Sequence, residues 1–302
     1  MNYLRTLAVL NLFWFLSLSG YGQEQGFLPA SAHFNRGRFN VVAASEVGVA
    51  TLATVGLEYL WYKKFPKSHF HFFNDDAEWL KMDKVGHATT AYNIAAIQYN
   101  LMRWSGVRTG TSAWIAGATG LAYMTMIEIM DGFSSQWGFS PGDMAANISG
   151  SLIFTGQQFM WGRQRMEMRF SFHHTLYAKY NPGELGRNFP QRMIKDYNGQ
   201  TYWLSFNLSS FAGKSNIPRW LNADFGFGAE GMTGAIKNPS MVDGKPIPSF
   251  TRERKIFFGL DGAFTTAHST PYPGWINIFR VPTPVIQWKP KEGKVTFKPF
   301  YF

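Results

Sequence analysis

Four long apolar segments in the first half of the chain predict helices. They carry few charged residues and are rich in Gly, Ala, Ser and Thr. Their ranges are 40–62, 83–104, 111–132 and 140–161. Each is close to the length that a bilayer requires, and small residues let helices pack closely either in a membrane or in water. Hydropathy alone therefore leaves open whether these helices span a membrane.

After about residue 165 the hydrophobic positions change from a helical period to a period of two. Apolar and polar side chains alternate in five segments, and a sixth segment shows a weaker alternation. The five segments are 168–180, 201–211, 220–230, 252–266 and 294–302, and the weaker one is 274–282. Alternation broken by polar Gly/Pro turns is typical of an antiparallel sheet. We therefore predict an α+β fold, with a bundle of about four apolar helices over residues 33–165 and an antiparallel β region over 166–302.

Two placements of the β region are compatible with this pattern. Alternating strands of about ten residues and a final aromatic residue, here Phe302, are typical of outer-membrane barrels. Six strands are fewer than the roughly eight of the smallest known single-chain barrels. Either the sequence hides further strands, or an open sheet packs its apolar side on the helices, because a water-soluble sheet alternates in the same way. A membrane-embedded sheet or partial barrel therefore stays open as an alternative.

The first residues, MNYLRTLAVLNLFWFLSLSGYGQEQ, have the pattern of a secretory signal peptide. One Arg precedes an apolar run from Leu7 to Leu18, and small and polar residues follow it. Because the run is short for a membrane span, we predict a signal peptide over residues 1–23 rather than an N-terminal membrane anchor. The protein is then exported to the bacterial cell envelope, either the outer membrane or the periplasm.

The composition agrees with an envelope location. Aromatic residues make up 17% of the chain, with 28 Phe and 11 Trp, and aromatic rings gather at membrane interfaces. The chain has no cysteine, which excludes disulfides, thiolate catalysis and cysteine-ligated zinc. A lipid anchor requires a cysteine at the mature N-terminus, so we also predict that the protein is not a lipoprotein.

The net charge of +10 arises entirely in the second half of the chain. Residues 33–150 hold nine Lys/Arg and nine Asp/Glu, whereas residues 151–302 hold nineteen Lys/Arg and nine Asp/Glu. Export argues against a nucleic-acid partner. A membrane with anionic lipid headgroups, or an acidic envelope glycan, is the partner that this charge suits. The alternative is a basic surface that only keeps the protein soluble.

Three of the predicted helices each carry a pair of polar residues at helical spacing. The pairs are Asp83 and His87, Glu128 and Asp131, and Asp143 and Asn147. Residues three or four apart lie on one face of a helix. Packed together, the three helices would bring these side chains into one polar cluster. Burial of such groups is costly unless they pair, form hydrogen bonds or bind a cation.

The fourth helix begins at the sequence SPGD. Ser140 suits the N-cap position, Pro141 the first helical position, and Asp143 lies three residues beyond the cap. This arrangement predicts a capping box that contains a carboxylate.

Three interpretations of the predicted cluster stay open. It can hold a divalent metal, Mn, Fe, Zn or Mg, with His87, Glu128, Asp131 and Asp143 as candidate ligands. It can instead perform metal-free acid–base catalysis, with His87, Glu128 and Asp143 as the candidate catalytic residues. The structural alternative is that Asp83 and Asp143 cap helices, while His87 and Asn147 satisfy neighbouring groups.

A second, weaker metal-binding pattern lies in the loop HFHFFNDD, residues 69–76. It offers His69, His71, Asp75 and Asp76 as ligands. The aromatic residues among them favour a loop at a membrane interface instead.

The segments WLKMDKVGHATTAY, EIMDGFSSQWGFSPGDMAANISG and KDYNGQTYWLS resemble an uncharacterised family of predicted periplasmic proteins and lipoproteins, the YfiM-like family. Within them, D-K-x-x-H, E-x-x-D and S-x-x-D-x-x-x-N-x-x-G are similar to the core pattern of VanZ-like membrane proteins. The resemblance spans roughly residues 60–165. It covers Asp83, Lys84, His87, Glu128, Asp131, Ser140, Asp143, Asn147 and Gly150.

The resemblance implies a domain of unknown function in the cell envelope and no established activity. We therefore predict a non-catalytic envelope protein that binds or organises a lipid or glycan around the polar cluster. The alternative is a metal-assisted hydrolase or transferase that acts on an envelope lipid.

Overall fold

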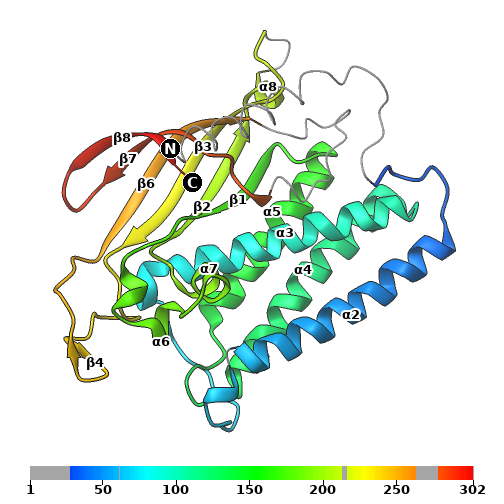
Figure 1. Cartoon of the computed structure of the whole chain (residues 1–302). Coiled ribbons are helices and arrows are strands. Elements are labelled where there is room, and N and C mark those ends of the chain that lie inside the picture. Colours follow the sequence, from blue (N-terminus) through cyan, green and yellow to red (C-terminus); the bar gives the residue numbers. More distant parts are fainter. Residues whose placement is uncertain (1–27, 61, 213–215, 263–277, 302) are drawn as a thin grey trace, which may run out of the picture.

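The computed structural model describes residues 28–60, 62–212, 216–262 and 278–301. A layer of long helices lies beside a six-stranded antiparallel sheet (Figure 1). The predicted α+β fold is therefore confirmed. The predicted signal peptide, residues 1–23, lies outside the described residues.

All four predicted long helices are present. They are α2 (Arg36–Leu60), α3 (Met82–Trp104), α4 (Thr109–Gly132) and α5 (Pro141–Trp161). Two of them are long and apolar enough to cross a membrane, judged by length and composition alone, over Arg36–Tyr59 and Thr109–Gly132.

Helices α3, α4 and α5 pack closely because glycines face their neighbours. A Cβ atom on Gly150 of α5 would lie 2.0 Å from the carbonyl oxygen of Ala88 on α3. A Cβ atom on Gly120 of α4 would lie 2.5 Å from the carbonyl oxygen of Ala91. The small residues that made hydropathy ambiguous thus have a packing role, since they bring the three helix backbones together.

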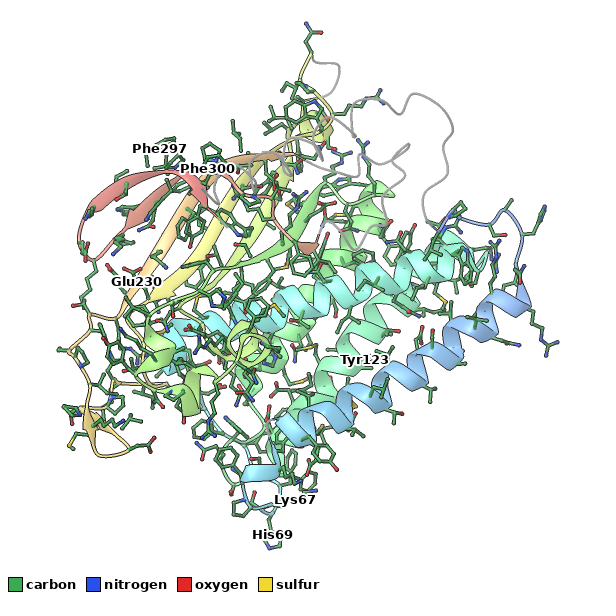
Figure 2. All side chains as sticks on the ribbon, viewed as in Figure 1. Lys67, His69, Tyr123, Glu230, Phe297 and Phe300 are labelled. Atoms are coloured by element: carbon green, nitrogen blue, oxygen red, sulfur yellow. The ribbon has the colours of Figure 1, made fainter. Side chains whose placement is uncertain are left out.

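Helix α2 lies at the edge of the helical layer, on the side of α4 away from the sheet (Figure 1). The hydroxyl of Tyr123 on α4 reaches it and donates to the backbone oxygen of Glu46 at 2.9 Å (Figure 2). Most of the large apolar side chains of α2 are nevertheless exposed, Leu52 among them.

The sheet has the order β1-β2-β3-β6-β7-β8. Its strands are β1 (Met166–Phe172), β2 (Gln200–Asn207), β3 (Leu221–Glu230), β6 (Glu253–Gly262), β7 (Thr283–Lys289) and β8 (Lys294–Tyr301). A separate small hairpin is formed by β4 (Met241–Val242) and β5 (Lys245–Pro246). Short helical segments fill the loops: η1 (Tyr62–Lys64), η2 (Glu78–Lys81), η3 (Tyr177–Lys179), α6 (Pro182–Leu185), α7 (Phe189–Lys195) and α8 (Leu208–Phe211).

One predicted strand is wrong and one strand was missed. Within 274–282, residues 274–277 lie outside the described part of the chain, and Phe279 forms only an isolated bridge to Phe170. The sixth strand is instead β7. Its pattern was hard to recognise, because Val285 and Gln287 face the same side of the sheet and so break the separation of apolar from polar positions.

The sheet is open, with β1 and β8 at its edges, and is not a closed barrel. It is nevertheless rolled, so that residues of distant strands meet on its inner face. The ring of Tyr301 on β8 stacks on Phe257 of β6 with centroids 4.4 Å apart. The Tyr301 hydroxyl also lies 3.0 Å from Thr201 Oγ1 on β2.

The outer face of β1, β2 and β3 packs on the helical layer. Tyr202 of β2 is buried with Trp79 and Met82, and Phe170 and Phe227 of the flanking strands surround them. This part of the sheet therefore follows the alternative in which the apolar side of an open sheet covers the helices.

Candidate functional site

The site begins where the chain enters α3. Trp79, Leu80 and Lys81 have φ values of 45°, 54° and 68°, and non-glycine residues in this left-handed region cost on the order of 1–2 kcal/mol each. Two contacts hold this segment: the Trp79 N–H donates to the Ala235 oxygen at 2.9 Å, and Arg254 Nε donates to the Leu80 oxygen at 3.2 Å. The sharp entry places the first turn of α3 against α5.

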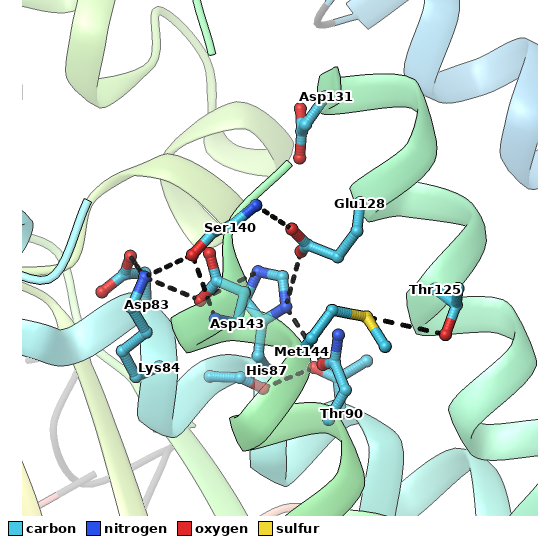
Figure 3. A network of polar contacts seen from close by, with 12 residues as sticks. Asp83, Lys84, His87, Thr90, Thr125, Glu128, Asp131, Ser140, Asp143 and Met144 are labelled. Carbon is cyan, nitrogen blue, oxygen red and sulfur yellow. Dashed lines mark hydrogen bonds and ion pairs between the residues drawn. The ribbon is translucent and has the colours of Figure 1, made fainter. Parts of the chain in front are cut away.

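The N-terminus of α5 forms the opposite wall of the site. Ser140 is the N-cap, and its Oγ accepts from the Asp143 N–H at 3.1 Å. The predicted reciprocal contact from Asp143 is replaced by Glu128 of α4, whose Oε2 accepts from the Ser140 N–H at 3.0 Å (Figure 3). The Asp143 carboxylate is therefore free to face α3.

Lys84, on the first turn of α3, lies among three carboxylates. Its Nζ is 2.5 Å from Asp75 Oδ1, 2.9 Å from Asp143 Oδ1 and 3.1 Å from Asp83 Oδ2. Burial lowers the pKa of Lys84, but these acids outweigh burial and raise it above its ordinary value. Lys84 is consequently a permanent internal cation. Asp83 pairs with Lys84, and the N-cap residue of α3 is Lys81, without a side-chain cap.

His87 lies one turn further along α3 and faces both α4 and α5. Its Nδ1 is 3.1 Å from Asn147 Oδ1 and 3.4 Å from Glu128 Oε1, and its Nε2 is 3.9 Å from Asp143 Oδ1. Burial lowers the pKa of His87 to about 4, and the nearby Lys84 charge lowers it further, against the hydrogen bond of Asn147. The imidazole is therefore neutral at physiological pH. If Nδ1 carries the proton and donates a hydrogen bond to Asn147 Oδ1, Nε2 has a free lone pair that faces Asp143.

We define the acidic cluster as the residues that these contacts join. They are Asp75, Asp83, Lys84, His87, Glu128, Ser140, Asp143 and Asn147. Within it, several buried polar atoms have no hydrogen-bond partner among the described residues. They include Asp83 Oδ1, Glu128 Oε1 and Asn147 Nδ2. Orphaned atoms of this kind are rare in folded proteins, so their concentration here calls for a ligand.

The cluster contains four carboxyl groups, those of Asp75, Asp83, Glu128 and Asp143, and one ammonium, that of Lys84. Burial raises the pKa of Asp143 to about 8, the hydrogen bond with Asp75 adds to the rise, and Lys84 opposes it. Burial also raises the pKa of Asp83, against the effect of Lys84. For Asp75, the hydrogen bonds with Asp143, Lys84 and Ser140 outweigh burial and lower the pKa. Lys84 alone thus does not keep all of these acids ionised at neutral pH, so the cluster holds a proton or binds a further cation.

Two sets of side chains have atoms close enough to hold a metal ion. They are His87, Glu128 and Asp143, and Asp75, Asp83 and Asp143, each with ligand atoms within 4.8 Å of one another. The second set already surrounds the Lys84 ammonium. The first set combines a neutral imidazole with two carboxylates, a donor set that suits divalent first-row metals.

Asp131 is a predicted ligand that the structure places elsewhere. Its Oδ1 accepts from the Tyr62 hydroxyl at 2.7 Å, and it belongs to neither ligand set among the described residues. The spacing to Glu128 placed both acids on nearby positions of α4, but a partner from outside the three helices engages Asp131.

Asp75 is the cluster member whose place the sequence did not reveal. Besides Lys84, it accepts from Ser140 Oγ at 2.6 Å. The sequence offered only two adjacent acids in an aromatic loop, grouped there with His69 and His71. Those histidines lie apart from the cluster: His71 Nδ1 contacts Ser68 Oγ and the His69 oxygen.

Residues 71–155 match the model of a family described as "Predicted periplasmic lipoprotein (DUF2279)". No curated protein and no solved structure matches the chain. The family description contradicts the prediction, made from the missing cysteine, that the protein is not a lipoprotein, and that prediction is wrong. The matched region comprises the helices of the acidic cluster, which carry no information on lipid attachment. The match therefore relates these helices to an uncharacterised family that is predicted to be periplasmic.

Proposed function

We propose that the protein is an envelope protein whose acidic cluster binds a divalent cation and, through it, an anionic group of an envelope lipid or glycan. Glu128 carries the proposal. Its side chain is 1% exposed, its Oε2 is held by the Ser140 N–H, and its Oε1 accepts no hydrogen bond from the described residues. A carboxylate oxygen that is buried, fixed in direction and unpaired is a strong ligand for a cation.

The ion would bind the neutral imidazole of His87 together with Glu128 and Asp143. The 3.9 Å between His87 Nε2 and Asp143 Oδ1 leaves room for an ion that bonds to both at about 2.0–2.2 Å. An imidazole ligand favours Mn²⁺ or Zn²⁺ over Mg²⁺ or Ca²⁺. Lys84 supports this site from one side, because it pairs with Asp75 and Asp83 and holds Asp143 in place.

A cation is needed before an anionic lipid or glycan can bind here. The cluster itself is acidic, so a phosphate or carboxylate group would be repelled without one. The likeness to YfiM-like and VanZ-like proteins, which rests on the motifs alone, favours an envelope role of this kind.

A metal-assisted hydrolase or transferase is the second candidate. It is favoured by the ligand set itself, because an imidazole and two carboxylates would leave room on the ion for a water molecule, which the ion could activate. The test is whether the metal-loaded protein converts an envelope lipid or glycan, and whether Asp143→Asn loses this activity. Both results together would favour an enzyme over a protein that only binds its ligand.

The test is the metal content of the purified protein, measured by elemental analysis after incubation with Mn²⁺ or Zn²⁺ and removal of free ions. The wild type should retain one ion, whereas His87→Gln and Glu128→Gln should retain little. Asp131→Asn is the matched control, because Asp131 is an acid on the same helix as Glu128 but is bonded to Tyr62.

Circular dichroism establishes that each variant is folded. Metal retained by the wild type and by Asp131→Asn, but not by the folded cluster variants, supports the proposal. A folded wild type that retains neither ion at neutral pH would refute it.

A further inference from the structure

The outer face of the rolled sheet is apolar, whereas its inner face carries buried ion pairs beside an aromatic cluster of Trp203, Phe257 and Tyr301. The inner face holds ion pairs: Arg169 Nη1 lies 2.7 Å from Asp261 Oδ2, and Arg280 Nε lies 2.9 Å from Asp224 Oδ2. All four side chains are buried. These four charged side chains thus point inward, and the alternating neighbours of those that lie on strands must point outward.

The outward neighbours form continuous apolar rows across four strands. In one row Phe225 of β3 pairs with Phe258 of β6, Phe258 with Ile286 of β7, and Ile286 with Phe297 of β8. A second row, two residues along, joins Phe227, Ile256, Trp288 and Val295. The apolar side chains therefore make one surface rather than scattered exposed residues.

Among the described residues, the helices cover this surface over β1, β2 and the Phe227 end of β3. Beyond β3 the sheet curls away from α3, and its large apolar side chains are exposed (Figure 2). Phe297 is 65% exposed and Phe300 is 64% exposed. We call the exposed part the apolar sheet face: Phe225, Phe258, Leu260, Ile286, Trp288, Val295, Phe297 and Phe300.

We propose that the apolar sheet face inserts into the hydrocarbon region of an anionic lipid bilayer. In lipid the favourable arrangement places apolar side chains outward and charged pairs inward, as β6, β7 and β8 do. From Val295 to Phe300 the face extends about 17 Å along β8, at roughly 3.3 Å per residue. This is a large part of the hydrocarbon thickness of about 30 Å.

A bilayer accounts for a second apolar surface that a single protein partner would leave uncovered. Helix α2 exposes Val47, Leu52 and Val55, and it lies on the far side of the helical layer from the sheet (Figure 1). A partner protein docked on the sheet would not reach α2, whereas lipid can contact both surfaces. The two surfaces together therefore favour lipid over a second copy of the chain.

The polar end of the apolar sheet face is suited to anionic headgroups. The β7–β8 turn carries Lys291, and Lys294 begins β8, against one nearby acid, Glu292. Lys289, at the end of β7, is already paired with Glu230 and Glu253 on the inner face. Lys291 and Lys294 are exposed. Lysines at the end of an apolar band can extend their ammonium groups to the phosphate level of a bilayer while their stems stay with the apolar side chains.

The absence of cysteine from the sequence gives a direct test. Single cysteines replace Leu260 or Phe297 on the apolar sheet face, and each carries an environment-sensitive nitrobenzoxadiazole label. Lys245→Cys, on the exposed β4–β5 hairpin, is the matched control. The full chain, purified in mild detergent, is reconstituted into vesicles of phosphatidylcholine and phosphatidylglycerol with and without acyl-chain spin-labelled lipid. Circular dichroism confirms the fold of each labelled variant.

We expect the spin-labelled lipid to quench the labels at residues 260 and 297, and their emission to shift to shorter wavelength, while the label at 245 does neither. Vesicles of phosphatidylcholine alone should bind less protein, and added salt should reduce the difference. Labels at 260 and 297 that stay as water-exposed as the control would overturn the proposal. So would labels that are shielded without lipid and show energy transfer between chains, because a second copy would then cover the face.

Discussion

The backbone N–H of Ser140 donates to Glu128 Oε2 over 3.0 Å, so an acid near the end of α4 satisfies the N-terminus of α5. A residue from a neighbouring helix thus takes the position that Asp143 would have in an ordinary capping box. The consequence is a division of roles: Glu128 orients the helix with one oxygen and faces His87 with the other, while Asp143 is released toward Lys84.

Replacement of Glu128 separates the capping role from the charge. Glu128→Ala leaves the buried Ser140 N–H without an acceptor, which should cost about 1–3 kcal/mol of unfolding free energy. Glu128→Gln keeps an oxygen at the same place and should cost less. Chemical denaturation of both variants in the presence of a chelator checks this. Equal losses would mean that the Ser140 contact does not matter to stability.

Replacement of Lys84 should be among the most destabilising changes in the cluster. Lys84→Met keeps the aliphatic stem but leaves Asp75, Asp83 and Asp143 without their cation, and the loss of one partner of a buried ion pair costs about 3–5 kcal/mol. Lys81→Met is the control, because Lys81 is exposed and surface substitutions change stability by about 0.5 kcal/mol or less. Thermal unfolding of the two variants gives the comparison. Added Mn²⁺ should restore part of the loss in Lys84→Met.

Two groups of the cluster give opposite pH dependences. The pKa of His87 falls from 6.5 to about 4 on folding, so the unfolded chain binds more protons between these values and stability rises with pH. The pKa of Asp143 rises from 3.8 to about 8, so the folded chain holds the extra proton and stability falls as the pH rises through this window.

Above about pH 6.5 His87 is neutral in both the folded and the unfolded chain. Of these two groups, only Asp143 then still changes the unfolding free energy with pH. We expect the unfolding free energy of the metal-free protein to fall between pH 6.5 and 8, and Asp143 contributes at most about 1.4 kcal/mol per pH unit to this fall. Glu128, whose pKa burial raises to about 8, adds to it. In Asp143→Asn the fall should be weaker. A set of denaturation curves across this range provides the measurement, and an identical slope in wild type and variant would contradict the assignment to Asp143.

Two glycines of α5 should respond to alanine in opposite directions. In Gly150→Ala the new Cβ would meet the Ala88 oxygen at 2.0 Å, so α3 and α5 must separate, at a cost of about 1–3 kcal/mol or more. In Gly156→Ala nothing lies within 4 Å, and the helix should gain about 0.5–1 kcal/mol. Denaturation midpoints of the pair report both signs. A loss in both variants would show that helix packing is not what distinguishes them.

Much of the fold follows from local patterns in the sequence. The four long helices and five of the six sheet strands were predicted, because helical period and alternation are properties of neighbouring residues. For the same reason the spacing of Asp83 and His87, and of Asp143 and Asn147, placed each pair on one helix face. The missed strand, β7, has an inner face that mixes Val285 with Gln287, so its alternation of polarity is hidden.

The sequence by itself therefore determined the elements and the helical members of the cluster, whose side-chain directions are set within one or two turns of the chain. Tertiary structure alone decided that Asp75 joins them from a loop, that Asp131 turns to Tyr62, and that Glu128 rather than Asp143 holds the Ser140 N–H. It also decided that the charged side of the sheet faces inward. These are contacts between residues far apart in sequence, and their partners exist only once the helices and strands have packed.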